Sequence, residues 1–588
     1  MAPVQPNPAK VNTTLVVGID FGTTFSGVSW LICKTGSTPG QPEVVSLWPT
    51  SVDNRRQNSD SQKVPTKMHY NKDFELAWGF KIPTGVETIE WFKLLLLEDR
   101  DLEKHLQRSS HLLEAKKLLS KLRLNSGRVI SDYLKALWNH TIEQIRDAKG
   151  PTVIDGMPFN VVVTVPAIWT DYARNRMREA AKRAGILDER GIDKTVLSFI
   201  SEPEAAAIAM MPELENRGDL KIGDSFVVLD AGGGTVDIIS YKINKFEPLS
   251  VSECVEGEGS LCGGTFLDKE FESLLKGAMG EMTWNKMNGS DIRRMMNNEW
   301  EHGIKEAFNG EPDYYTVELP SRAHSAPLQF SSDELRPIFD NIFSQIAGLA
   351  QKQVHAIKMK TSCLPKLVIL VGGFGRSPYM LKYLKARLHS QITILQARGD
   401  KPWTAICRGA ALSLANELSS TRAQPLLQSR ISRLNYGWSF AAPFTYGFHD
   451  IRDRFWDATV QEWFADGQME WVIKRGDNIS LQKAKTYSYR LDWPLTEHGY
   501  KNNTWSVYTC DDPSPPSRKE DHIQKAASFF YRTPKPVECF ERVDKNNSCS
   551  YRKWSHEWKV VVSGASFDIY LVSDGEEEKI ENICVETT

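Results

Sequence analysis

Two short stretches of this 588-residue sequence combine aspartate, glycine and threonine in an order suited to binding a phosphate group. The first is Asp20-Phe21-Gly22-Thr23-Thr24 and the second is Asp230-Ala231-Gly232-Gly233-Gly234-Thr235. Glycine has no Cβ, so backbone N–H groups in such a stretch can approach an anion closely. A threonine hydroxyl adds a further donor, and the leading carboxylate can hold Mg²⁺ or a water bound to it.

The residues around both stretches predict a strand, a turn and a second strand. Leu15–Trp30 and Phe226–Tyr241 are apolar and rich in β-branched residues on either side of the turn. One copy alone is equally compatible with an ordinary glycine-rich hairpin. Two copies, with Asp20 and Asp230 separated by 210 positions, favour two related half-domains that face one nucleotide.

A third glycine-rich turn follows the apolar segment Leu367–Val371, in the sequence Val-Gly-Gly-Phe-Gly-Arg-Ser-Pro. Ser377 and Pro378 are typical of a helix start. With the two turns above, this motif resembles the ATPase superfamily of actin, sugar kinases and the 70-kDa heat-shock proteins, and the heat-shock branch in particular. The fold class implied is α/β: a two-lobed actin-like ATPase with duplicated ribonuclease-H-like half-domains, followed by a β-rich C-terminal domain.

The resemblance implies ATP or ADP with Mg²⁺ between the two lobes, and a set of binding residues. Asp20 and Asp230 hold the metal. The nucleotide contacts it implies are Gly22, Thr23, Thr24, Gly232, Gly233, Gly234, Thr235, Gly263, Gly264, Gly372, Gly373 and Arg376. Gly263 and Gly264, with Asp268, match a Gly-Gly-x-x-x-Asp segment of the family. Trp403 stands where the family usually has an aspartate, which puts part of the coupling to partners in doubt.

Three residues are expected to arrange the water that attacks ATP: Lys93, Glu202 and Asp237. Lys93 lies in Glu90–Leu97, a lone lysine in apolar surroundings, and the alternative is a snorkelling surface lysine. Glu202 begins Glu-Pro-Glu-Ala-Ala-Ala and resembles the family's metal-water glutamate. The alternative for Glu202 is helix-start electrostatics alone.

Glu301 and Lys305 lie four residues apart in a predicted helix. In the heat-shock family a glutamate and a lysine of this helix contact the adenosine. Because the match slips by one residue, the sequence favours a plain surface ion pair.

Composition excludes several other classes of protein. Apolar residues make up 41% and charged residues 25%, and the net charge is −2, so neither nucleic acid nor an anionic membrane is indicated. The nine cysteines form no C-x-x-C pair and favour reduced thiols over a disulfide framework. No apolar run is long enough to cross a bilayer, and the proline-rich start predicts no signal peptide. We expect a cytoplasmic protein, with the nucleus as a second compartment.

The domain boundaries follow from changes in composition. Residues 1–12 are expected to be disordered, 13–415 to form the nucleotide-binding domain and 416–433 a linker. Residues 434–588 alternate aromatic and polar positions between turn residues and predict a β-rich domain without a helical lid. Trp471–Ile479 resembles a β-sandwich string of the heat-shock family.

Three functions remain open on the sequence. The first is a slowly hydrolysing, chaperone-like ATPase whose nucleotide state controls a peptide-binding β-domain, with client polypeptides and co-chaperones (a J-domain protein and a nucleotide-exchange factor) as partners. The second is a small-molecule kinase of the same superfamily, which leaves the β-domain unexplained. The third is a nucleotide-binding scaffold or sensor with little turnover. ATP binding without hydrolysis would separate the third from the first.

Overall fold

The computed structural model describes residues 13–51, 61–83, 85–102, 107, 109–167, 169, 171–215, 217–246, 249–396, 399, 401–418, 427–480, 484–545, 549–563, 566–580 and 582–583. The chain divides into two compact units. The first comprises Met1–Trp169 and Arg176–Leu426, and the second comprises Thr170–Asn175 and Leu427–Thr588. No helix among the described residues is both long and apolar enough to span a membrane.

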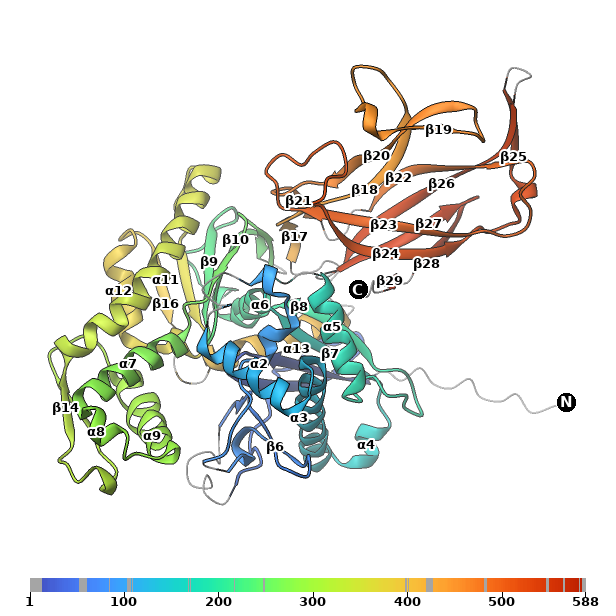
Figure 1. Cartoon of the computed structure of the whole chain (residues 1–588). Coiled ribbons are helices and arrows are strands. Elements are labelled where there is room, and N and C mark those ends of the chain that lie inside the picture. The colour runs from blue at the N-terminus through green and yellow to red at the C-terminus, as the bar shows by residue number, and fades with distance from the viewer. Residues whose placement is uncertain are drawn as a thin grey trace. The chain divides into compact units, whose positions relative to one another are not determined.

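The first unit contains two sheets built on the same plan (Figure 1). In each, a hairpin is followed much later in the sequence by a strand parallel to its first strand. The first sheet has the order β3-β2-β1-β7-β8, with β4 paired to β2. Its strands are β1 (Thr13–Phe21), β2 (Phe25–Lys34), β3 (Glu43–Val44), β4 (Val64–Pro65), β7 (Phe159–Val165) and β8 (Val196–Ser201).

The second sheet repeats this plan with the order β16-β15-β9-β10-β11, and β12 pairs with β10. Its strands are β9 (Ser225–Ala231), β10 (Val236–Phe246), β11 (Leu249–Glu253), β12 (Glu258–Ser260), β15 (Leu367–Val371) and β16 (Thr393–Gln396). Strands β9 and β15 are buried throughout, as expected for parallel strands covered on both faces. The predicted fold class is confirmed: a two-lobed α/β unit with duplicated halves, followed by a β-rich region.

Helices cover both sheets, and two of them cross at the middle of the unit. Helix α13 (Lys401–Leu418) packs on β1, β2, β7 and α6 (Glu202–Glu215). The small alanine side chains of α6 let its backbone pack directly against the backbone of α13. A Cβ on Gly409 of α13 would lie only 1.6 Å from the Ala205 carbonyl oxygen of α6. The other helices of the lobe built on the first sheet are α2 (Ser110–Leu122), α3 (Ser126–Lys149), α4 (Pro151–Asp155) and, from Arg176 onward, α5 (Asp171–Arg183).

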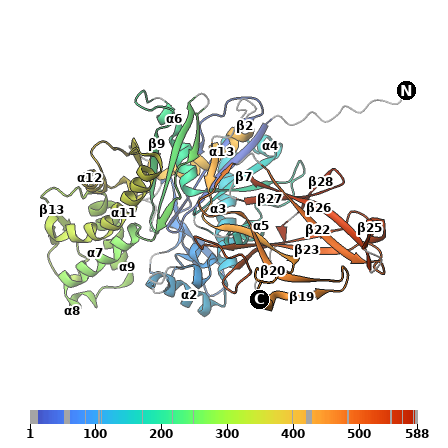
Figure 2. The ribbon, with the colours of Figure 1, turned by 90° about the horizontal axis from the view of Figure 1, so that it is seen from above.

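The second lobe surrounds an aromatic core. Phe271 stacks on Trp300 at 4.0 Å and Phe308 on Phe339 at 4.2 Å between ring centroids. Its long helix begins with a capping box of Ser331 and Glu334. Helices α11 and α12 lie side by side in both views (Figures 1 and 2). The elements are α7 (Gly264–Met279), α8 (Glu281–Trp284), α9 (Gly289–Arg294), the π-helix η5 (Met295–Ile304), α10 (Lys305–Ala307), β13 (Tyr314–Val317), β14 (Leu328–Ser331), α11 (Ser332–Thr361) and α12 (Pro378–Arg387).

The second unit is a sandwich of two antiparallel sheets, and its described part from 427 onward contains no α-helix (Figure 2). One sheet has the order β19-β20-β18-β23-β24-β29 and the other β22-β26-β27-β28, with β25 on β26. The strands of these two sheets are β18 (Asn435–Pro443), β19 (Arg454–Asp457), β20 (Glu462–Ile473), β22 (Lys485–Pro494), β23 (Asn502–Cys510), β24 (Gln524–Arg532), β25 (Glu541–Lys545), β26 (Cys549–Ser563), β27 (Ser566–Ser573), β28 (Glu576–Ile580) and β29 (Asn582–Ile583). Strands β17 (Leu427–Ile431) and β21 (Asn478–Ser480) pair with each other and belong to neither sheet.

Aromatic rings from both sheets fill the core of this sandwich. Trp505 of β23 stacks on Trp558 of β26 at 4.5 Å, with an interplanar angle of 5°. His556 of β26 is 3% exposed and stacks on Trp554 at 4.0 Å, with Tyr531 nearby. Burial lowers the pKa of His556 to about 4, so the imidazole is neutral at pH 7.

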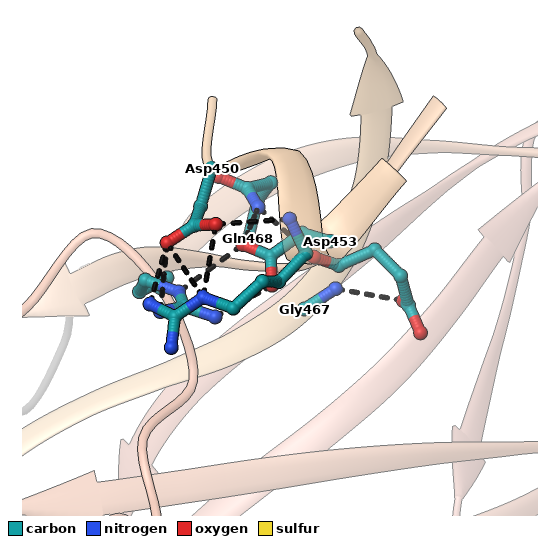
Figure 3. A network of polar contacts seen from close by, with 7 residues as sticks. Asp450, Asp453, Gly467 and Gln468 are labelled. Carbon is teal, nitrogen blue, oxygen red and sulfur yellow. Dashed lines mark hydrogen bonds and ion pairs between the residues drawn. The ribbon is translucent and has the colours of Figure 1, made fainter. Parts of the chain in front are cut away.

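A polar network fixes the turn between β18 and β19 (Figure 3). Arg518 forms ion pairs with Asp453 at 2.6 Å and with Asp450 at 3.4 Å. Arg452 donates to the same Asp450 carboxylate at 2.6 Å, and this hydrogen bond lowers the pKa of Asp450. Gln468 of β20 donates to Asp453 at 3.4 Å. The network therefore ties the turn to β20 and to the loop before β24.

The α6–α13 crossing leads to a first prediction. Gly409→Ala should lower the free energy of unfolding of the first unit by about 3 kcal/mol or more, because the added methyl overlaps backbone that cannot move aside. Gly277→Ala is the matched control, since Gly277 is an exposed glycine in α7 with no atom near its missing Cβ. That control should gain about 0.5–1 kcal/mol. Urea unfolding of both variants measures the difference, and equal stabilities would contradict this account of the crossing.

The buried histidine gives a second prediction. The folded pKa of His556 is below its unfolded value of 6.5, so its contribution to stability is complete above that value and is lost as the pH falls toward 4. The loss amounts to about 3 kcal/mol over that range. From pH 7 to pH 4.5 the hydrogen-exchange protection factors of β26 peptides, which correct for the slower intrinsic exchange in acid, should therefore fall more in the wild type than in His556→Phe. His498→Gln, at an exposed position, should behave as wild type; acid sensitivity unchanged in His556→Phe would refute the assignment.

Candidate active site

The two glycine–threonine turns meet face to face in the first unit. A Cβ placed on Gly233 would lie 2.1 Å from Thr24 Oγ1, and one on Gly234 would lie 3.1 Å from Thr23 Cγ2. A distance below 3.0 Å cannot accommodate a methyl group against a neighbouring atom, so Gly233 has to be glycine. The structure thus brings together the turns that the sequence predicts to face one ligand.

Four carboxylates are buried around this contact. Asp20, Asp230, Glu202 and Asp237 are between 2% and 5% exposed. Asp20 is the second-last residue of β1, and Glu202 begins α6 directly after β8. Asp230 and Asp237 oppose each other across the β9–β10 hairpin. The strand ends converge because both hairpins direct their turns to the same place.

Burial raises the pKa of Asp230 well above its usual value, and the charges of Glu202, Asp237 and Asp20 raise it further. Its Oδ1 atom is buried and accepts no hydrogen bond. A buried acceptor without a donor is costly, so this oxygen is suited to a cation or a ligand donor. The observation fits the predicted metal ligand.

Lys93 lies in the 3₁₀-helix η3 (Phe92–Leu96) and is 1% exposed. Its ammonium donates to Glu202 Oε1 at 2.5 Å and lies 5.5 Å from the ring centroid of Trp169. The surface-lysine alternative is therefore wrong, because the side chain is enclosed. Burial raises the pKa of Glu202, and the Lys93 charge opposes that rise.

The other two glycine segments close around the second turn. A Cβ on Gly263 would lie 2.4 Å from the Gly233 carbonyl oxygen, and Gly264 N donates to Gly232 O at 3.1 Å. Gly372 has φ +83°, and a Cβ there would lie 2.4 Å from Asp230 Oδ1. Only glycine combines that dihedral angle with such closeness. These segments therefore belong to one site with Asp230.

Gly373 and Arg376 lie against Trp403, the residue that stands where the family usually has an aspartate. A Cβ on Gly373 would lie 3.2 Å from the Trp403 indole, and the Arg376 guanidinium lies 5.9 Å from the centroid of that ring. Phe25 contacts the same indole edge-on at 5.7 Å. Trp403 therefore occupies space beside the predicted adenosine contacts.

The Glu301–Lys305 pair is buried and has a third member, unlike the surface ion pair that the sequence predicts. Lys305 donates to Glu301 at 2.6 Å and also to Asp268 at 2.7 Å, and its side chain is only 11% exposed. The expectation of a plain surface pair was wrong, since α7 brings Asp268 onto the lysine. Burial lowers the pKa of Lys305, yet Asp268 and Glu301 outweigh burial and raise it overall. A Cβ on Gly264 would lie 3.3 Å from this ammonium, which joins the cluster to the glycine segments.

Sequence reasoning missed one residue of the site, Lys63. Its ammonium forms an ion pair with Asp20 Oδ2 at 2.5 Å, and the residue is 5% exposed. The available signal was a lysine directly before a Val-Pro pair that forms β4. That signal is weak, because nothing in the local sequence indicates that β4 pairs with β2.

The donors present suit the phosphates of a nucleotide, with backbone N–H groups in glycine turns and two threonine hydroxyls. For a divalent cation the fit is uneven: Asp230 Oδ1 is without a partner, whereas Asp20 Oδ2 is taken by Lys63. In the part of the chain that the structure describes, no three His, Cys, Asp or Glu residues form a ready metal-binding group.

Fold and site together define a two-lobed α/β protein in which two glycine–threonine turns and four buried carboxylates meet between duplicated halves. The Hsp70 protein family model matches residues 154–441. The chain is 21% identical over 530 residues to heat shock 70 kDa protein 12A of Mus musculus, across 74% of this chain and 73% of that protein. The matched segment and the relatives support a divergent chain of the 70-kDa heat-shock protein (Hsp70-type) kind, at low sequence identity.

Two further relatives extend the comparison. Heat shock 70 kDa protein 12A of Homo sapiens is 21% identical over 475 residues, across 65% of this chain and 66% of that protein. A chaperone protein HscA homolog of Burkholderia cenocepacia is 30% identical over 254 residues, but this chain spans only 36% of its length. These relatives support a nucleotide-binding, chaperone-like function with ATP or ADP as the nucleotide.

Proposed function

We propose that the chain binds ATP between its duplicated halves, hydrolyses it slowly to ADP and phosphate, and uses the nucleotide state to control polypeptide binding by the β-rich unit. The observation that carries this proposal is the buried Lys93–Glu202 pair beside the two facing turns. An enclosed lysine and carboxylate next to a phosphate cradle are what activation of a water molecule requires. The compartment we propose is the cytoplasm.

Different residues of the site bind the phosphates and activate the water. Thr23, Thr24 and the backbone N–H groups of Gly233–Thr235 donate to phosphate oxygens. The Gly232 N–H closes the turn by donating to the Thr235 carbonyl oxygen at 2.9 Å. Glu202 has a pKa raised by burial, which makes it a better acceptor for a proton of the attacking water. Lys93 holds that carboxylate in place and offsets its charge, and Asp237 lies opposite Asp230 as a second acceptor.

The metal contributes charge neutralisation on the phosphates when it is bound. Asp230 is the residue of this chain best placed to hold it, because its Oδ1 atom is buried and unpartnered. Gly263, Gly264, Gly372 and Gly373 let the backbone approach the nucleoside closely, and Arg376 is expected to lie against the base.

An exposed aromatic surface on the β-rich unit supports polypeptide binding. Strand β19 is at the end of its sheet order, so one of its edges is open among the described strands. Trp456 of β19 and Trp463 of β20 are 49% and 44% exposed, and they contact each other at 5.2 Å. Phe448 in the preceding turn is 80% exposed. An open strand edge flanked by aromatic rings suits an extended apolar segment.

The hydrolysis prediction uses single-turnover kinetics on the whole chain with Mg²⁺. Lys93→Ala should lower the rate by about 10²-fold or more while ATP still binds, since the lysine orients the base rather than the cradle. Lys276→Ala, an exposed lysine of α7, is the control and should match wild type. An unfolded peptide should accelerate the wild type.

Two other outcomes would replace the proposal. Phosphate transferred to a sugar from an added panel would make the protein a small-molecule kinase. ATP bound tightly by wild type, with no turnover under any condition, would leave a nucleotide-binding scaffold and would remove the catalytic role of Lys93.

The polypeptide prediction concerns the aromatic surface. The double substitution Trp456→Ser and Trp463→Ser should weaken binding of an unfolded, aromatic-rich peptide by about tenfold or more. Tryptophans that become buried when a partner binds contribute most of the affinity of such interfaces. Phe530→Ser removes an equally exposed ring (54%) from β24 and serves as the control. Fluorescence anisotropy of a labelled peptide measures the affinity. Equal losses in both variants would argue against a site at β19.

A further inference from the structure

Lys63 is placed at the nucleotide site by two strand pairings. Asp20 pairs with Gly27 across β1 and β2, and β4 pairs with β2 through Ser26 and Val64. Lys63 therefore lies beside Gly27, which has no side chain. A Cβ on Gly27 would lie 3.0 Å from Lys63 Cγ, so the aliphatic part of the lysine covers this glycine. Its ammonium then reaches Asp20 on the neighbouring strand.

The Lys63 side chain remains positively charged in the folded protein. The Lys63 ammonium forms a buried ion pair with Asp20 Oδ2 at 2.5 Å, and this carboxylate stabilises the charged form of the lysine. An ammonium has three donors, and Asp20 takes one of them. The lysine is thus a permanent cation beside a carboxylate that otherwise serves as a metal ligand.

A purely structural ion pair explains this arrangement poorly. Burying a lysine with a carboxylate gains little over an apolar pair, because both charges lose their hydration. The pair also lies among Asp230 and Glu202, whose carboxylates both interact electrostatically with Lys63. A third observation concerns Asp230, whose Oδ1 stays buried without a hydrogen-bond donor. Asp20 therefore has a cation, Lys63, bound to its carboxylate, whereas Asp230 Oδ1 has no hydrogen-bond donor.

We propose that Lys63 is a nucleotide-binding residue that acts as a built-in cation of the phosphate site. Its ammonium neutralises Asp20 and donates to a phosphate oxygen of ATP or ADP, so it supplies part of the charge that a divalent metal would otherwise provide. Nucleotide binding then depends only weakly on Mg²⁺. The inference rests on the proposed nucleotide binding and goes beyond it by assigning a residue and a metal dependence.

The test measures equilibrium binding of ATP and ADP to the whole chain by calorimetry, with Mg²⁺ and with EDTA. The wild-type Kd should change by less than about tenfold on removal of the metal. Lys63→Met should weaken binding in EDTA by about 10- to 100-fold, the value of a charge-assisted hydrogen bond. Mg²⁺ should restore part of the loss, because Asp20 is then free to bind it. Lys63→Arg should keep most of the metal-free affinity.

Lys67→Met is the matched control, since Lys67 lies in the same segment, is 41% exposed and pairs with Glu90 instead. A second readout needs no nucleotide. Electron paramagnetic resonance of Mn²⁺ should show tighter metal binding to Lys63→Met than to wild type, because the substitution removes the cation that competes for Asp20. The comparison of wild-type ATP binding with Mg²⁺ and with EDTA uses no substituted protein, so it remains valid if Lys63→Met fails to fold.

The outcomes separate the two claims. ATP binding that is lost in EDTA by about 10³-fold or more in wild type, or that is unaffected by Lys63→Met, overturns the role of Lys63 and leaves the proposed function standing. Absence of ATP and ADP binding under both conditions overturns the proposed function, and the inference falls with it.

Discussion

The contact between the two glycine–threonine turns is the constraint on which the rest of the first unit depends. Gly233 and Gly234 lie directly on Thr24 and Thr23, with no room for a methyl group at Gly233. Because each turn is the end of a hairpin, this contact fixes how the two sheets meet. It also buries the acidic residue at the start of each turn, Asp20 and Asp230.

Burial of those carboxylates creates an electrostatic problem that other elements must solve. Four acidic side chains lie within the site, and each loses its hydration. Lys93 from η3 and Lys63 beside β4 each pair with one of them, Glu202 and Asp20. Both lysines come from the segments between β2 and α2, so this stretch supplies the positive charge of the site. Breaking such a buried pair typically costs about 3–5 kcal/mol, which ties the fold of this stretch to the chemistry.

How far the sequence predicts this structure depends on the range of the interaction. The hairpins and the Gly372 turn follow from local residue types, because β-branched runs and a glycine needing positive φ are visible in a few residues. Lys63 was not predictable in this way, since its role arises from pairing of β4 with β2 some 40 residues away. Lys305 was misjudged for the same reason: spacing indicated Glu301, but Asp268 of α7 buries it.

The repeat in the sequence suggests two equivalent aspartates, and the structure makes them different. Asp20 faces a fixed ammonium, whereas Asp230 Oδ1 has no hydrogen-bond donor and its pKa is raised by burial and by the surrounding acids. A cation would therefore gain more at Asp230 than at Asp20, because Asp20 already forms an ion pair whereas Asp230 Oδ1 has no donor. The duplicated halves thus preserve the two facing glycine–threonine turns, while Lys63, which lies outside the repeat, makes the charge at the two aspartates unequal.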